Sequence, residues 1–106
     1  MPKPHHPSAA ARRVLSKLGT DIREARRRRG LPMAVVADRA FTSRSTLQRI
    51  EAGDSAVSIG IYAAVLQALG LLEGLGEVAD ISSDLVGQAL ASEALPQRMR
   101  LKRIKS

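Results

Sequence analysis

The 106-residue sequence contains no cysteine, and its only aromatic residues are Phe41 and Tyr62. Without cysteine the chain can form no disulfide framework, no thiol nucleophile and no Cys-ligated zinc site. Its apolar runs are far shorter than the roughly 20 residues that a membrane-spanning helix needs. The apolar residues, 44% of the chain, are mainly Leu, Ile, Val and Ala. This composition favours a small core of packed helices.

The sequence offers little support for catalysis or for a bound cofactor. His5 and His6 are adjacent in a Pro-rich stretch, which makes a weak metal trap at best. The Ser and acidic residues lack a His or Cys partner that could complete a nucleophilic triad. Gly74 and Gly76 follow no predicted strand, so they do not form a phosphate-binding loop. We expect a protein that is not an enzyme and that has no metal, no cofactor and no small-molecule substrate.

The first residues have no apolar stretch after their charge, so they do not look like a secretory signal. We therefore expect a cytoplasmic protein with no membrane partner.

Charge is divided into three blocks along the chain. Residues 1–53 contain twelve Lys or Arg and four Asp or Glu, whereas residues 54–96 contain six acids and no Lys or Arg. Residues 97–106 contain five Lys or Arg and no acid. The first block suits binding to a polyanion such as DNA. Lys and Arg side chains that neutralise phosphates release the counterions condensed on the nucleic acid, which favours binding. The acidic block would repel DNA, so it should face solvent, a second subunit or another protein. The alternative for the first block is an ordinary solvated face.

Apolar residues recur at helical spacing, and no strand pattern is long enough to carry a sheet. Val14, Leu15, Leu18, Ile22 and Ala25 form the stripe of the first helix, which Gly19 should weaken. Val36 and Ala37 should point inward from the second helix, and the stripe of the fourth is Tyr62, Val65, Leu66 and Leu69. The predicted helices are 9–29, 32–40, 44–52, 59–69, 71–79 and 84–94.

Capping residues mark the helix ends. Gly30, Gly53 and Gly70 stand where helices should stop, and Pro32 fits the first turn of the second helix. Ser43 and Ser58 are good N-caps, and Ser82 or Ser83 should cap the sixth helix.

Residues 43–54 are the most informative stretch. Leu47 and Ile50 are the only large apolar residues there, and the rest of the first two turns is polar. A short helix with one narrow apolar stripe and outward Arg, Ser and Gln suits the DNA major groove. Together with helix 32–40 and a three-residue turn, it predicts a helix-turn-helix.

The sequence resembles the Xre/Cro-C1 helix-turn-helix repressor family over about residues 15–78. The residues that carry the resemblance are Arg26, Ala37, Leu47, Ile50, Glu51, Gly53 and 66–70. Residues 57–62, 65–71 and 95–98, followed by a basic tail, are similar to HipB-type antitoxins. The resemblance implies an all-α, five-helix lambda-repressor-like domain at 9–80, with a flexible arm at 1–8, a sixth helix within 81–96 and a basic C-terminal tail at 97–106.

The resemblance also assigns roles to residues. Arg44, Ser45, Gln48 and Arg49 are the expected base readers, and Thr46 is an expected phosphate contact. Arg can bond guanine bidentately and Gln can bond adenine. Within the run 26–29, one or two of Arg27, Arg28 and Arg29 should contact phosphates. The alternative for these residues is solvated helix surface. Arg26 and Glu51 should instead form a largely buried ion pair between the first and third helices.

Helix two departs from the family pattern. Position 32 usually holds a polar cap and position 33 often holds a Gln that contacts a phosphate, but here they are Pro32 and Met33. Val35 also replaces a common polar residue. We therefore expect weaker DNA binding than in a typical member, unless the Arg residues compensate.

Three functions fit the sequence. The first is a HipB-like antitoxin that represses its own operon as a homodimer on a palindromic double-stranded operator, associates with the nucleoid and neutralises a HipA-like Ser/Thr kinase. The second is a stand-alone Xre-type repressor. The third is a protein-interaction module with weakened DNA binding. The tail should contact the partner protein or the DNA backbone, unless it is only a solubilising end, through Arg98, Arg100, Lys102, Arg103 and Lys105.

Overall fold

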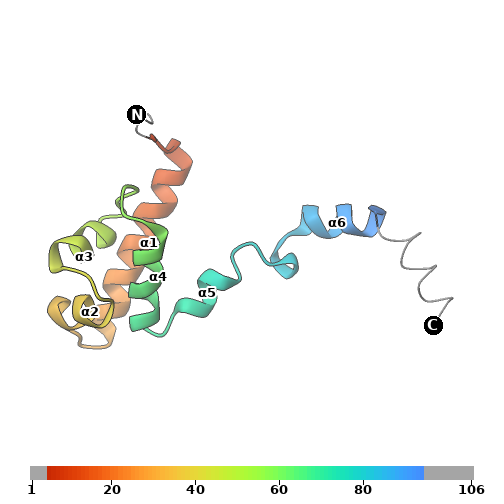
Figure 1. Ribbon diagram of the computed structural model, residues 1–106. Helices are drawn as coiled ribbons and strands as arrows, with labels where there is room; N and C mark the ends of the chain where they lie inside the picture. Colours follow the sequence, from red (N-terminus) through yellow and green to blue (C-terminus); the bar gives the residue numbers. More distant parts are fainter. Residues whose placement is uncertain (1–4, 95–106) are drawn as a thin grey trace. The chain divides into compact units, whose positions relative to one another are not determined.

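The structure is a computed structural model and describes residues 5–94. This part of the chain contains six α-helices, one short 3₁₀ helix and no strand, which confirms the all-α prediction. The elements are α1 (Ala9–Arg28), α2 (Met33–Arg39), α3 (Arg44–Glu51), α4 (Ile59–Ala68), α5 (Leu72–Gly76), η1 (Ile81–Ser83) and α6 (Leu85–Ala94) (Figure 1).

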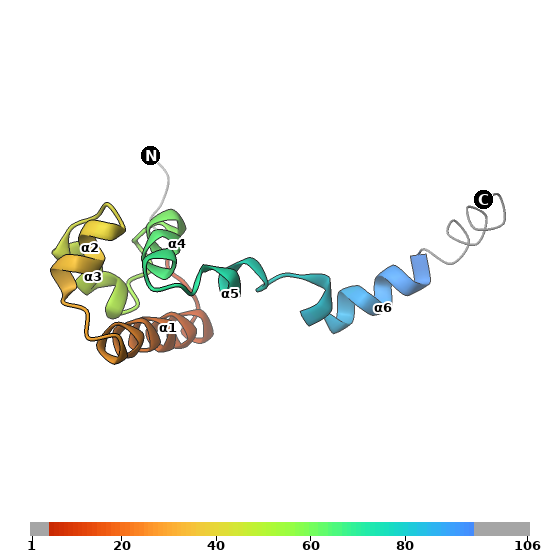
Figure 2. The same cartoon turned by 90° about the horizontal axis from the view of Figure 1, so that it is seen from below.

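The chain divides into two units, and the boundary in the sequence falls between Leu72 and Glu73. In the first unit α3 packs against both α1 and α2, and α2 also packs against α4 (Figures 1 and 2). Each of these four helices contributes to one core. Its largest fully buried side chains are Ile22, Val36, Leu47, Ile50 and Val65. Because α3 supplies two of the five, its position is fixed by apolar burial on one face.

Four consecutive helices end in the same hydrogen-bonded turn, the Schellman motif. In each, the residue after the C-cap has a positive φ, and the following N–H donates to a carbonyl five residues back. Gly30, Gly53 and Gly70 adopt this conformation after α1, α3 and α4, as the sequence predicts. After α2 the same place is taken by Phe41, with φ 55°.

Three of these helices have a serine as their N-cap. Ser8, Ser43 and Ser58 accept hydrogen bonds from the N–H groups of Ala11, Thr46 and Ile61, at 3.1, 3.1 and 3.4 Å. The caps predicted at Ser43 and Ser58 are therefore confirmed. Pro32 is the N-cap of α2 rather than a residue of its first turn, and it provides no side-chain cap.

The helix α1 runs unbroken past Gly19. This glycine lies against the end of α3, where an added Cβ would be 2.6 Å from the carbonyl oxygens of Ile50 and Glu51. Gly53, which follows α3, makes the corresponding close approach to α1. A Cβ at Gly53 would be 2.6 Å from the Leu15 carbonyl oxygen. Two glycines thus let the backbones of α1 and α3 cross closely, a role that sequence reasoning missed.

The predicted stripe of α1 is wrong at its first residue. Val14 is 67% exposed, because the buried face of α1 begins further along and its fully buried residues are Gly19, Ile22 and Ala25. The stripe predicted for α4 is confirmed, since Tyr62, Val65, Leu66 and Leu69 are all buried.

The second unit contains η1 and α6, which pack against each other. The cap predicted at Ser82 or Ser83 is wrong, because these residues belong to η1. Asp84 caps α6 instead, accepting a hydrogen bond from the Gly87 N–H at 2.8 Å. A hydrogen bond from Ser82 lowers the pKa of Asp80, the N-cap of η1. Among the described residues, no helix has the length and apolar character that crossing a membrane requires.

Candidate DNA-binding surface

The two faces of α3 differ sharply. Leu47 and Ile50 are completely buried, and they hold the helix against α1 and α2. The four expected base readers all lie on the exposed side of the helix: Arg44, Ser45, Gln48 and Arg49. The structure therefore brings these side chains together on one polar face, which a fixed apolar face supports.

A network of hydroxyl groups holds the first turn of α3. Ser43 Oγ accepts from the Thr46 N–H and donates to Thr46 Oγ1 at 2.9 Å. Ser45 Oγ lies 3.1 Å from Ser43 Oγ. Thr46, the expected phosphate contact, is half-buried and takes part in the cap. Because its hydroxyl accepts from Ser43, its own proton can still be donated to a phosphate oxygen.

Arg49 is held at the other end of α3. Its Nε donates to Asp54 Oδ2 at 2.8 Å, and this hydrogen bond lowers the pKa of the Asp54 carboxyl. Asp54 also accepts from the Ala56 N–H at 2.8 Å, and its carbonyl accepts from the Tyr62 hydroxyl at 2.7 Å. Burial raises the pKa of Tyr62. Asp54 thus connects a candidate base reader to the loop before α4.

Sequence reasoning did not find the contact between Arg49 and Asp54. The available signal was the Asp54-Ser55-Ala56 sequence, because an Asp side chain often bonds the N–H two residues on in a turn. Nothing in the sequence alone indicates that Arg49 would turn toward that carboxylate.

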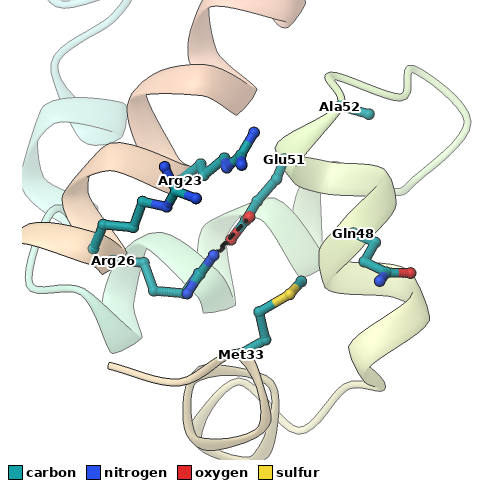
Figure 3. Close-up of a pocket in the computed structure, with 7 residues that line it drawn as sticks. Arg23, Arg26, Met33, Gln48, Glu51 and Ala52 are labelled. Carbon is teal, nitrogen blue, oxygen red and sulfur yellow. Dashed lines mark hydrogen bonds and ion pairs between the residues drawn. The ribbon is translucent and has the colours of Figure 1, made fainter. Parts of the chain in front are cut away.

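Arg26 and Glu51 form an ion pair between α1 and α3. Arg26 Nε lies 2.8 Å from Glu51 Oε2, and Nη2 lies 3.2 Å from Oε1 (Figure 3). The remaining Nη1 donates to the Leu31 carbonyl at 3.0 Å. The side chains are only 12% and 8% exposed, and the hydrogen bond to Glu51 raises the pKa of Arg26. The pair fixes the end of α3 to α1 and to the loop before α2.

A cleft of about 440 Å³ lies beside the polar face of α3, between α1, α2 and the second half of α3 (Figure 3). It is lined by Arg23, Arg26, Arg27, Met33, Gln48, Glu51 and Ala52. Since Glu51 neutralises Arg26, the net positive charge comes from Arg23 and Arg27. The cleft therefore suits an anion that lies next to α3.

The three expected phosphate contacts of α1 lie in different places. Arg27 lines the cleft and makes only a long, exposed ion pair with Glu24, at 3.8 Å. Arg29 turns back to its own helix, where Nη1 donates to the Ala25 carbonyl at 2.9 Å. Arg28 is exposed at the last residue of α1. Arg23, which is one helical turn before Arg27, joins it in the cleft.

Met33 also lines the cleft, where its half-buried side chain lies between Arg26 and Gln48 (Figure 3). It gives the cleft an apolar wall. The basic tail residues Arg98, Arg100, Lys102, Arg103 and Lys105 lie outside the described residues.

Two short helices joined by a tight turn, with the second helix buried on one face and polar on the other, define a helix-turn-helix. A sequence model of the helix-turn-helix domain matches residues 17–79, more than half of the chain. The chain therefore belongs to the helix-turn-helix domain family. This membership indicates DNA as a partner and a role in transcriptional regulation, in a class that is typically non-enzymatic. Comparisons with curated proteins and with solved structures gave no significant match.

Proposed function

We propose that this protein is a sequence-specific repressor that places α3 in the major groove of double-stranded DNA. One observation carries the proposal: four polar side chains share the exposed face of a helix whose opposite face is completely buried. The major groove admits an α-helix, and each base pair presents a distinct pattern of donors and acceptors there. A DNA target would also place the protein in the cytoplasm, with the nucleoid.

Different residues would position the protein and read the sequence. Arg44 is at the N-terminus of α3 and exposed, so it is free to bond guanine O6 and N7. Gln48 is exposed one turn later and can bond adenine. The Asp54 carboxylate fixes the direction of Arg49. Arg23 and Arg27 would hold a backbone phosphate in the cleft, in place of the side-chain anchor that Met33 lacks.

Arg44→Ala should relax specificity without abolishing DNA binding. A good bidentate contact discriminates by roughly 1–3 kcal/mol, or about 5- to 150-fold in affinity. We expect this loss on a palindromic duplex from upstream of the gene and almost none on a scrambled duplex, as measured by fluorescence anisotropy. An equal loss on both duplexes would make Arg44 a phosphate contact instead.

Arg27→Ala is the matched variant for the phosphate role. It should weaken binding to both duplexes equally and reduce the slope of log K against log salt concentration by about 0.9. If the salt slope is unchanged, no phosphate occupies the cleft beside Arg27. Wild-type binding that does not depend on salt would reject DNA binding through this surface altogether.

We further propose that the protein acts as a homodimer through the region of α4 to α6. Ile59 at the start of α4 is 73% exposed, and in the second unit Leu85, Val86 and Leu90 of α6 are 77%, 71% and 59% exposed. This region contains no Lys or Arg, so it does not suit DNA. A dimer would present two copies of α3 to a palindrome.

Sedimentation equilibrium at micromolar concentration should therefore give twice the 11.4 kDa mass of the chain. Leu85→Ser with Leu90→Ser should shift the protein toward the monomer, while Val14→Ser, which changes an exposed residue of α1, should not. A wild-type monomer under these conditions would reject the dimer.

The finer proposal is a HipB-like antitoxin, supported by the sequence resemblance and by the exposed apolar residues outside the DNA-binding face. It requires a HipA-like kinase gene beside this gene and a stable complex of the two products by size-exclusion chromatography. A stand-alone repressor is the alternative. It would have no kinase gene beside it and would bind its operator without a partner.

A further inference from the structure

The turn between α2 and α3 (Figure 1) contains an unusual residue, Phe41. The residue is 97% exposed, and it is the one non-glycine residue with a positive φ among residues 5–94. A large side chain in this conformation is strained, and an exposed ring gains nothing from burial. Phe41 therefore contributes nothing to the core and works against the turn that it occupies.

The chain itself provides the comparison. Helices α1, α3 and α4 end in the same Schellman motif as α2, and glycine occupies the positive-φ position in all three. The turn at Phe41 is otherwise regular. The Phe41 N–H donates to the backbone carbonyl of Asp38 at 3.0 Å, and the Thr42 N–H donates to that of Ala37 at 2.9 Å. Glycine would fit there without strain. The fold therefore does not explain why position 41 holds phenylalanine, and we look for a binding partner that contacts the ring.

The residues around Phe41 favour DNA as the partner that contacts the ring. The ring precedes the N-cap of α3, Ser43, by two residues and Arg44 by three. Arg39 and Arg44 flank the turn and are exposed, whereas Asp38 is the acid nearest to Phe41 in the sequence. Arg49 is paired with Asp54, so the excess positive charge near the ring comes from Arg39 and Arg44. A partner protein that covered the ring would have to accept these cations, whereas a polyanion is attracted by them. In the major groove, thymine presents a 5-methyl group that apolar side chains such as Phe contact.

We propose that Phe41 is a DNA-contacting residue whose ring packs against a thymine 5-methyl group next to the base read by Arg44. This inference rests on the proposed DNA-binding function and adds one specificity contact to it. The structure thereby assigns the strained turn a role in recognition.

The test uses the full-length protein and a duplex that the wild type selects from a randomised library. Each thymine is replaced in turn by deoxyuridine, which lacks only the 5-methyl group. The wild type should lose about fourfold in affinity at one thymine per half-site, the value of one buried methyl group. Phe41→Ala should bind the unmodified duplex about fourfold more weakly and be insensitive to deoxyuridine at that position.

Two variants separate the ring from the turn. Phe41→Ala keeps a side chain at positive φ, so its melting temperature should stay close to that of the wild type. Phe41→Gly removes the ring and the strain together, so it should melt about 5 °C higher and yet lose the same affinity. Full affinity and an unchanged deoxyuridine profile in both variants would overturn the proposal and indicate that the ring contacts a protein. If the wild type selects no duplex at all, the proposed function itself fails.

Discussion

Glu51→Gln should destabilise the first unit by about 3 kcal/mol, the largest effect expected of a substitution that leaves side-chain size nearly unchanged. The Arg26 side chain is 12% exposed, and two of its guanidinium nitrogens donate to the Glu51 carboxylate. Removing the negative charge leaves Arg26 largely buried with only the weaker attraction of Glu24, which makes no hydrogen bond to it. Urea unfolding, followed by circular dichroism, would measure the loss as a lower midpoint at constant slope.

The chain offers a matched control for this prediction. Lys17 and Asp21 form an ion pair at 2.6 Å, but the side chains are 77% and 56% exposed. Asp21→Asn should therefore cost less than about 0.5 kcal/mol. Arg26→Met combined with Glu51→Leu should restore most of the stability that Glu51→Gln loses, because no charge remains buried. Equal losses for Glu51→Gln and Asp21→Asn would contradict the role given to burial.

Gly19→Ala should destabilise the same unit by about 2 kcal/mol, although Ala is the better helix former by about 1 kcal/mol. The new Cβ would lie 2.6 Å from two carbonyl oxygens and 2.7 Å from the Gly53 nitrogen. All three atoms belong to the backbone, so no side chain can turn aside to make room. Either α1 or the end of α3 must move, and this movement would also disturb the Arg26–Glu51 pair.

Gly60→Ala provides the contrast, since Gly60 is a helical glycine of α4 with room for a methyl group. A Cβ there would lie no closer than 3.8 Å to Ser58 Oγ. This substitution should stabilise the protein by roughly 0.5–1 kcal/mol. Thermal unfolding of the two variants side by side should move the midpoint in opposite directions. A higher midpoint for Gly19→Ala would contradict the close crossing of α1 and α3.

The sequence was sufficient to predict the helices and most of their ends, because these depend on local chemistry. Ser43 and Ser58 cap helices wherever their hydroxyls can reach the next turn, and Gly53 ends α3 because it accepts a positive φ. The buried face of α4 follows from spacing alone. The interpretation of residues 43–54 as a helix with one apolar face agrees with the burial of Leu47 and Ile50.

The contacts between distant residues could not be predicted in this way. The importance of Gly19 depends on where α3 ends in space, and a helix propensity carries no such information. The pairing of Arg49 with Asp54 depends on the direction of the chain after α3. Phe41 adopts a conformation that its residue type disfavours, because the hydrogen bonds of the turn determine its backbone. These are the features in which tertiary structure overrides local preference.

Taken together, the buried contacts of the first unit serve to fix α3. Leu47 and Ile50 hold its inner face, the Arg26–Glu51 pair and the Gly19–Gly53 crossing hold its end, and the Ser43 network holds its first turn. A base-reading helix needs this rigidity, because hydrogen bonds to base edges depend on exact placement of the side chains.

Methylation protection tests most directly whether α3 reads the major groove. Dimethyl sulfate attacks guanine N7, which lies in that groove. On a duplex selected by the wild type, the bound protein should protect guanines in two groups about 34–36 Å apart, or a multiple of that distance, and Arg44→Ala should expose a guanine in each group. A saturated complex in which every guanine N7 stays reactive would contradict the placement of α3 in the major groove.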